Sequence, residues 1–251
     1  MSINKTEALV LKKYEVRETS LIANFYTRDF GKVSGILKGI RKNPEKFASS
    51  LEPFSLNELI FYKKENNPVH LVSACDLKDN FNLIRQNMQR ITCASIIAEL
   101  LDVLMPAEDR NEEIFDLAIE SLKALEINTR PEKIAAIFKI KLLALSGFKP
   151  HIDSCVSCDS RIAGESRFSL NLGGLLCQRC FPRDTKSRQV FRGTVASILH
   201  IERNEFKDNL NLGMNPQIKK ELDMVLNSFL NFHLGKELKS VKVSNKLALT
   251  V

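Results

Sequence analysis

The stretch Ser20-Leu-Ile-Ala-Asn-Phe-Tyr-Thr-Arg-Asp-Phe-Gly-Lys-Val-Ser-Gly-Ile-Leu-Lys38 reads as two strands joined by a tight turn. β-Branched and aromatic residues are frequent in it, which is typical of strands. In its middle, Arg28-Asp29-Phe30-Gly31 predicts a hairpin turn, because Gly31 can adopt the positive φ that such turns require. The predicted strands are Ser20–Thr27 and Lys32–Lys38.

Three further runs of apolar and β-branched residues flank this hairpin. They are Thr6–Tyr14, Ser55–Tyr62 and Val69–Leu77, with Asn66-Asn67-Pro68 separating the last two. Five short strands in about eighty residues predict a small closed barrel. The OB-fold, which commonly binds single-stranded nucleic acid, is one such barrel, and a five-stranded SH3-like barrel has the same pattern.

From Phe81 onward the apolar periodicity becomes helical. The apolar faces fall at 91–101, 114–125 and 134–145, then at 191–206, and finally on a helix opened by Asn215-Pro216 and ended by Gly235. The tail, 236–251, is expected to be a short added strand or a mobile end. The sequence therefore predicts an α+β protein with a barrel domain at residues 1–80 and a helical domain at 81–251.

Four cysteines follow the spacing of a metal site. Cys155 and Cys158 form one C-x-x-C pair, Cys177 and Cys180 form a second, and 18 residues separate the pairs. Zinc prefers four tetrahedral ligands, and four protein ligands leave no open coordination position. We therefore expect one structural zinc ion, held in a module that covers about residues 151–183 and interrupts the helical domain.

Other interpretations of the cysteines are a redox pair or a set of free thiols. A redox motif follows a strand in a βαβ unit, whereas Cys155 follows a predicted helix that ends at Gly147. His151 could replace a cysteine, but a histidine in a loop is more often solvated. Cys75 and Cys93 fall in the predicted last strand and first helix, where burial in the core is expected.

The charge balance favours a polyanionic partner without identifying it. The chain carries 37 Lys and Arg against 30 Asp and Glu, a formal charge of +7. Both ends are basic and the middle is close to neutral. The start, MSINKTEALVLKKYEV, lacks the apolar core of a secretory signal, and no run reaches the roughly 18 apolar residues that span a bilayer. A cytoplasmic protein is expected.

Basic residues cluster at the end of the predicted hairpin and just beyond it. We expect nucleic acid to contact Lys32, Lys38, Arg41, Lys42 and Lys46, because Gly39 in this loop permits close approach of the backbone to phosphates. The alternative is a solvated edge on which lysine prevents strand pairing.

Aromatic residues interleave with this basic stretch. Phe25 and Tyr26 fall on opposite faces of their strand, so one of them is expected to be exposed and able to stack on a base.

Motifs of common enzyme families are missing. No phosphate-binding loop, G-x-S-x-G elbow or H-E-x-x-H occurs, and the histidines show no ligand spacing. The acidic side chains fit helix starts and solvated helix faces. We expect no enzyme activity, and a metal-dependent nuclease is the remote exception.

Three segments of the chain form a recognisable combination. The first combines Glu18–Ile22, Tyr26-Thr27, Gly31 and Lys38–Lys42; the second runs from Phe138 to Pro150 and leads into Cys155 and Cys158; the third combines Phe168 with Gly173–Cys177. Together they resemble the RecO family of bacterial recombination mediators and DNA repair proteins. The order of helix, Gly-x-x-Pro and cysteines is the specific part. The resemblance implies an N-terminal OB-fold, a helical domain and a four-cysteine zinc module, although some family members lack the zinc ligands.

The resemblance also implies a function. Similar proteins bind single- and double-stranded DNA, anneal complementary strands, associate with RecR and engage the acidic C-terminal tail of single-stranded DNA-binding protein, and so help RecA load onto coated DNA. By motif match, the loop Lys38–Lys42 would bind DNA in a cytoplasmic protein that acts at the nucleoid. The alternative is a zinc-containing protein–protein adaptor with incidental DNA binding.

Overall fold

The structure, a computed structural model, describes residues 2–16, 18–40, 51–63 and 67–248 of the 251-residue chain. The chain forms two compact units, one of residues 1–135 and 239–251 and the other of residues 136–238. The division into domains at residue 80 stays a prediction.

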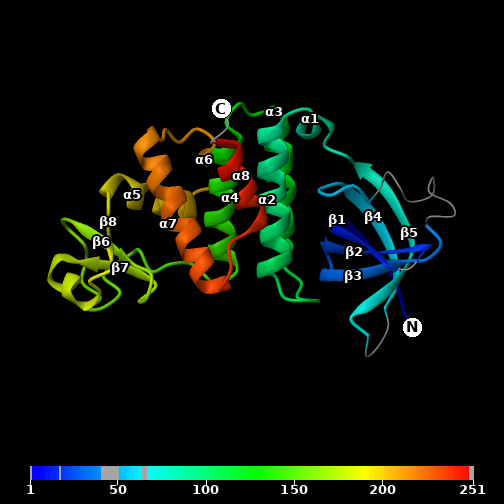
Figure 1. Ribbon diagram of the computed structural model, residues 1–251, viewed down its shortest axis with the longest axis horizontal. Coiled ribbons are helices and arrows are strands. Elements are labelled where there is room, and N and C mark those ends of the chain that lie inside the picture. The colour runs from blue at the N-terminus through cyan, green and yellow to red at the C-terminus, as the bar shows by residue number, and fades with distance from the viewer. Residues whose placement is uncertain (1, 17, 41–50, 64–66, 249–251) are drawn as a thin grey trace. The chain divides into compact units, whose positions relative to one another are not determined.

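The first unit contains a closed five-stranded barrel (Figure 1). Its strands are β1 (Ser2–Val16), β2 (Ser20–Thr27), β3 (Gly31–Leu37), β4 (Leu56–Lys63) and β5 (Val69–Asp79). They are ordered β1-β2-β3-β5-β4, and β1 also pairs with β4 to close the barrel. All pairs are antiparallel except β3 with β5. The five predicted strands and the OB-fold barrel are confirmed.

Because side chains alternate between the two faces of each strand, every second one points into the barrel. The residues packed inside are mostly aliphatic and aromatic: Ala8, Val10, Ala23, Phe25, Val33, Leu37, Ile40, Leu51, Leu59, Phe61, Val72 and Cys75. The predicted hairpin turn is also present. Gly31 has φ +62°, and the Thr27 hydroxyl donates to the Gly31 carbonyl at 2.8 Å.

Four helices complete the first unit together with the start of a fifth. They are α1 (Asn82–Arg85), α2 (Met88–Leu104), α3 (Glu112–Ile127) and α8 (Lys239–Ala248), and α4 (Pro131–Leu145) crosses the boundary between the units. Asn87 starts α2 by accepting hydrogen bonds from the Gln89 and Arg90 backbone N–H groups at 2.9 and 3.1 Å. The prediction of a strand or mobile end after residue 235 is wrong, because residues 239–248 form α8 beside α2.

The second unit combines helices with a small sheet. Its strands are β6 (Ser166–Ser169), β7 (Gly174–Cys177) and β8 (Arg188–Val190), in the order β7-β6-β8. The helical elements are η3 (Gln178–Arg183), α5 (Arg192–Arg203), α6 (Phe206–Asn209) and α7 (Pro216–Leu234). No helix in the described part of the chain combines the length and apolar character that a membrane crossing demands.

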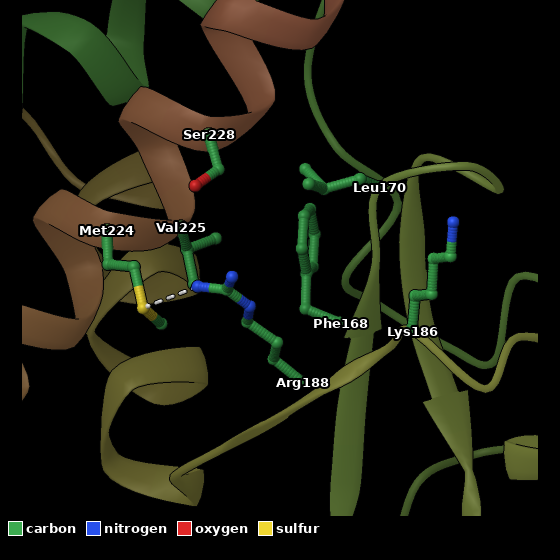
Figure 2. Close-up of a pocket in the computed structure, with 7 residues that line it drawn as sticks. All are labelled: Phe168, Leu170, Lys186, Arg188, Met224, Val225 and Ser228. Carbon is green, nitrogen blue, oxygen red and sulfur yellow. Dashed lines mark hydrogen bonds between the residues drawn. The ribbon is translucent and has the colours of Figure 1, made fainter.

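One face of the small sheet packs on α7. Phe168 of β6 makes an edge contact with Phe229 of α7 at 6.2 Å between ring centroids. A small pocket lies beside this contact, with Phe168 and Val225 in its wall (Figure 2). As predicted, α7 opens at Asn215-Pro216, where Asn215 Oδ1 accepts from Ile218 N at 2.7 Å, and ends at Gly235 with φ +63°.

Candidate metal centre and nucleic-acid interface

The two cysteine pairs are held by different local structures. Cys155 and Cys158 lie in a tight turn in which Asp159 N donates to Cys155 O at 2.8 Å and Cys155 N donates to Ser160 O at 3.0 Å. Cys177 is the last residue of β7, and Cys180 lies one turn further on in η3. The loop before β7 turns at Gly173, which has φ +71°.

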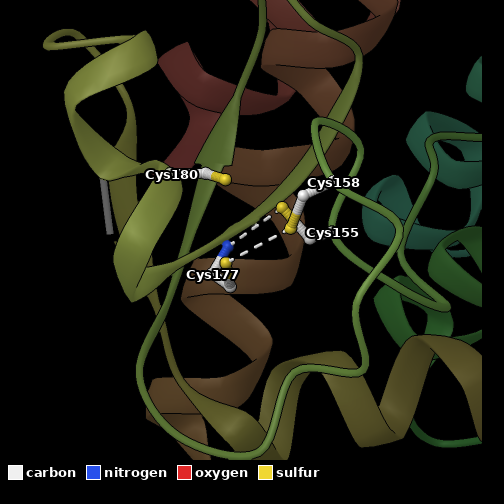
Figure 3. Close-up of side chains that lie close together, drawn as sticks. All are labelled: Cys155, Cys158, Cys177 and Cys180. Carbon is white, nitrogen blue, oxygen red and sulfur yellow. Dashed lines mark hydrogen bonds between the residues drawn. The ribbon is translucent and has the colours of Figure 1, made fainter.

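The four sulfur atoms face one another (Figure 3). All four lie within 4.8 Å of one another, and Cys158 Sγ is 3.8 Å from Cys177 Sγ. Tetrahedral zinc with Zn–S bonds of about 2.3 Å needs sulfur atoms about 3.8 Å apart. Four thiols at this spacing could therefore hold a metal ion, and zinc fits both the donor set and the distances.

Hydrogen bonds and burial shift the pKa values of the thiols in different directions. The Ser160 hydroxyl and backbone N–H lower the pKa of Cys158 to about 6, whereas burial raises the pKa of Cys180 to about 11. The lowered pKa favours the Cys158 thiolate, which is the form that binds a metal. Cys177 N also donates to Cys155 Sγ at 3.4 Å, a contact that joins the two cysteine pairs.

The remaining cysteines and His151 lie outside this cluster. His151 Nε2 is 2.7 Å from the Ser154 hydroxyl on the exposed surface, and it is not one of the clustered groups in the described chain. Cys75 and Cys93 are buried, as predicted.

The predicted nucleic-acid-binding residues have different surroundings. Lys38 is exposed directly after β3 and is followed by Gly39 with φ +74°, while Ile40 is anchored in the barrel core. Lys32 is half-buried, and its Nζ donates to the Asp102 carbonyl of α2 at 2.7 Å. The other three predicted residues, Arg41, Lys42 and Lys46, lie outside the residues that the structure describes.

The expectation that Phe25 or Tyr26 is exposed is wrong. Both side chains are fully buried, Phe25 inside the barrel and Tyr26 on its outer side. Tyr26 stacks on Phe115 of α3 with 6.5 Å between ring centroids, so helix packing covers the outer face of β2. Neither ring is available to stack on a base.

The packing of α2 and α3 on the outer face of the barrel was not predicted from the sequence. The Asp102 carboxylate of α2 accepts from Asn24 Nδ2 at 2.8 Å and forms an ion pair with Lys12. The backbone carbonyl of Asp102 accepts a hydrogen bond from Lys32 Nζ. Nothing near Asp102 in the sequence marks it as a contact to the barrel, because its three partners lie more than 60 residues away.

Family models match nearly the whole chain. Residues 1–81 match the model described as "Recombination protein O N terminal", and residues 85–242 match "Recombination protein O C terminal". The chain is similar to the "DNA repair protein RecO" of Syntrophus aciditrophicus (strain SB), with 32% identity over 97% of this chain and 96% of that protein. It is 27% identical to the protein of the same name from Thermoanaerobacter sp. (strain X514), over 98% of this chain and 99% of that protein. The chain belongs to the RecO family.

Proposed function

We propose that this protein acts in DNA repair and homologous recombination as a mediator that binds single- and double-stranded DNA and anneals complementary strands. Its family membership supports the repair role. The observation that carries DNA binding is the exposed end of β3, where no described carboxylate lies within ion-pair distance of Lys38 and Gly39 opens the basic stretch that follows.

Annealing on such a surface needs no covalent chemistry. Lys38, Arg41, Lys42 and Lys46 would neutralise phosphates, which lowers the repulsion between two strands and allows complementary bases to meet. Lys32 would contribute mainly by holding α2 to the barrel, because its ammonium group is already bound to a carbonyl. The protein would act in the cytoplasm, at the nucleoid, without hydrolysing a nucleotide.

The proposed protein partners are RecR and the acidic C-terminal tail of single-stranded DNA-binding protein, through which RecA would be loaded onto coated DNA. The resemblance to the family suggests them. Charge supports the second, because residues 183–251 carry 12 basic against 7 acidic side chains.

The four cysteines would hold one structural zinc ion. With four thiolate ligands the ion has no open position, so it would fix the chain around β7 and η3 and supply no reaction chemistry. In this proposal basic side chains contact DNA, and the metal stabilises the fold around the cysteines.

An annealing assay with two complementary labelled strands, without ATP, tests the function. The wild-type protein should accelerate annealing at low salt, and K38Q/R41Q/K42Q should reduce both the acceleration and the affinity for single strands. A matched control removes three cations that are bound to carboxylates, K5Q/K63Q/K78Q, and should stay close to wild type. If the wild-type protein binds an acidic peptide but leaves annealing unchanged, the adaptor function replaces this proposal.

A further inference from the structure

Most cations of the described barrel are neutralised by neighbours. Six of its eight described lysines and arginines lie within 4 Å of a carboxylate oxygen: Lys5, Lys12, Lys13, Arg28, Lys63 and Lys78. Lys32 binds a carbonyl, which leaves Lys38 as the exposed cation without a described counter-ion. Free positive charge on the described barrel is therefore scarce.

The second unit shows the opposite pattern next to its four-cysteine cluster. The segment Gln178–Arg188, called here the basic segment, carries four exposed cations: Arg179, Arg183, Lys186 and Arg188. None of the four lies within ion-pair distance of a carboxylate in the described chain. Their charge is thus available to a ligand.

The single carboxylate of the basic segment is committed to internal contacts. Asp184 is 8% exposed; its Oδ2 accepts from the Ser169 hydroxyl at 2.6 Å and its Oδ1 from Lys186 N at 2.9 Å. Asp184 therefore shapes the backbone between the cations instead of neutralising them from the surface.

The backbone of the basic segment is fixed at three places. Cys180, near its start, packs in the four-cysteine cluster, the contact between Asp184 and Ser169 fixes its middle, and Arg188 of β8 pairs with Phe168 of β6 at its end. Cations on a fixed backbone lose less conformational entropy when they bind a ligand.

The surroundings of Arg188 indicate an anionic ligand. Its guanidinium donates to the Met224 sulfur at 3.6 Å in the pocket beside α7, and a thioether is a weak acceptor (Figure 2). Lys186 lines the same pocket, whose volume is about 30 Å³. Both cations lie at the rim of an open pocket, where they can meet a negatively charged group.

An arginine from the neighbouring strand adds to this surface. Arg167 of β6 lies with its guanidinium carbon 4.7 Å from the centre of the half-buried Phe181 ring, within the basic segment, and has no carboxylate partner in the described chain. Arginine binds phosphate through a planar fork of donors, so four arginines and one lysine suit a chain of phosphates.

We propose that the basic segment, together with Arg167, binds the phosphate backbone of a nucleic-acid strand and forms a contact surface separate from the barrel loop. The inference rests on the proposed function in taking DNA as the partner. It extends that function, because annealing needs contacts to two strands. A zinc ion held by the four cysteines would then also hold in place the segment that carries the charge.

The test measures single-stranded DNA affinity of the full-length protein over a range of salt concentrations. The variant R179Q/R183Q/K186Q should lower the slope of log affinity against log salt by about 2, since each phosphate contact on a single strand contributes about 0.7. Affinity at low salt should fall at least tenfold. The matched control K5Q/K63Q/K78Q removes the same charge and should keep the slope near wild type. Zinc content and thermal unfolding verify that each variant is folded.

An unchanged slope and affinity in folded R179Q/R183Q/K186Q would overturn the inference. A labelled oligo-aspartate peptide is the second probe: loss of peptide binding with intact DNA binding would also overturn it, in favour of an acidic protein partner. Failure of the proposed function gives a different result, because the wild-type protein would then bind single strands without accelerating their annealing. In that case the salt dependence of binding would still show whether the basic segment contacts phosphates.

Discussion

Lys32 and Asp102 join the barrel to α2. Lys32 Nζ donates to the Asp102 carbonyl at 2.7 Å, and the neighbouring carboxylate, whose side chain is 10% exposed, forms an ion pair with Lys12. Burial lowers the pKa of Lys32, which indicates an ammonium group held partly away from water. The outer face of β1, β2 and β3 is thus used for packing at a position where the sequence alone predicted contact with DNA.

Lys32 and Lys38 should therefore respond differently to mutation. Lys32→Met should lower the free energy of unfolding by about 1–2 kcal/mol, because the Asp102 carbonyl loses a hydrogen bond at a half-buried site. Lys38→Gln, on the exposed loop, should change it by less than about 0.5 kcal/mol. Urea denaturation gives both values. A folded K32M protein of wild-type stability whose DNA affinity had lost part of its salt dependence would instead show that Lys32 binds phosphate.

The sequence predicted the barrel well because its signals are local. Alternation of apolar residues and the turn at Gly31 depend on neighbours within a few positions, and all five strands are found close to their predicted bounds. The burial of Tyr26 and the role of Asp102 depend on packing between segments more than 70 residues apart along the chain, which no local pattern records.

The same distinction applies to the two candidate sites. The clustering of the four cysteines was predictable because C-x-x-C spacing is itself the geometric requirement for two ligands on one ion. The basic segment was not, because its free charge depends on Asp184 turning to Ser169, a contact made only in the folded unit.

The helix formed by the tail should depend on Glu99. The Glu99 carboxylate of α2 accepts from Lys239 N at 2.9 Å and from Ser240 N at 2.8 Å, the first backbone donors of α8. Glu99→Gln should cost about 1–2 kcal/mol of stability, since it removes a negative charge from a helix N-terminus and weakens both bonds. Amide hydrogen exchange should show faster exchange confined to α8. Equal protection of α8 in the variant and the wild type would contradict this role.

Two glycines with positive φ should differ in their tolerance of alanine. A Cβ atom on Gly31 would lie 2.0 Å from the Asp109 carbonyl oxygen, whereas no atom of the described residues lies within 4 Å of one on Gly39. Gly39→Ala should cost about 1 kcal/mol for the left-handed backbone alone. Gly31→Ala must in addition displace the loop between α2 and α3. Its loss of folding stability should therefore exceed that of G39A by at least about 2 kcal/mol. Thermal unfolding of the two variants in one buffer compares them directly, and equal costs would contradict the close packing at Gly31.

Stability should fall in acid partly through Glu108. Lys63 lowers the pKa of this carboxyl below its usual 4.5, with a further hydrogen bond from buried His70 at 3.0 Å. Because the folded pKa is depressed, the stabilisation is complete above about pH 5 and is lost as the pH falls through the folded pKa. Denaturation of E108Q should therefore differ from wild type by a constant amount above pH 5 and converge with it at lower pH. The control E120Q, at an exposed position of α3 without a described cationic partner, should show no such convergence.

Removal of the metal should unfold the chain around the cysteines before it affects the barrel. Cys155→Ser or Cys177→Ser should abolish the binding of one zinc ion per chain, measured by native mass spectrometry, because each removes one of four clustered ligands. The melting temperature should fall by about 10 °C or more, since structural zinc sites contribute many kcal/mol and about 1 kcal/mol corresponds to 2–4 °C in a chain of this size. Hydrogen exchange should increase in β7, η3 and the basic segment, while β1–β3 keep their protection.

The matched control for this experiment is the buried Cys93 of α2, which lies outside the cluster. Cys93→Ala should keep full zinc content, and any loss of stability in this variant reports contacts around α2 and not the metal. Because a zinc ion held by the four cysteines would fix Cys180 near the start of the basic segment, zinc-free protein should also lose the part of the DNA salt dependence that R179Q/R183Q/K186Q removes. Zinc-free protein that retained wild-type exchange rates in η3 would show that the segment is held by Asp184 and β8 without the metal.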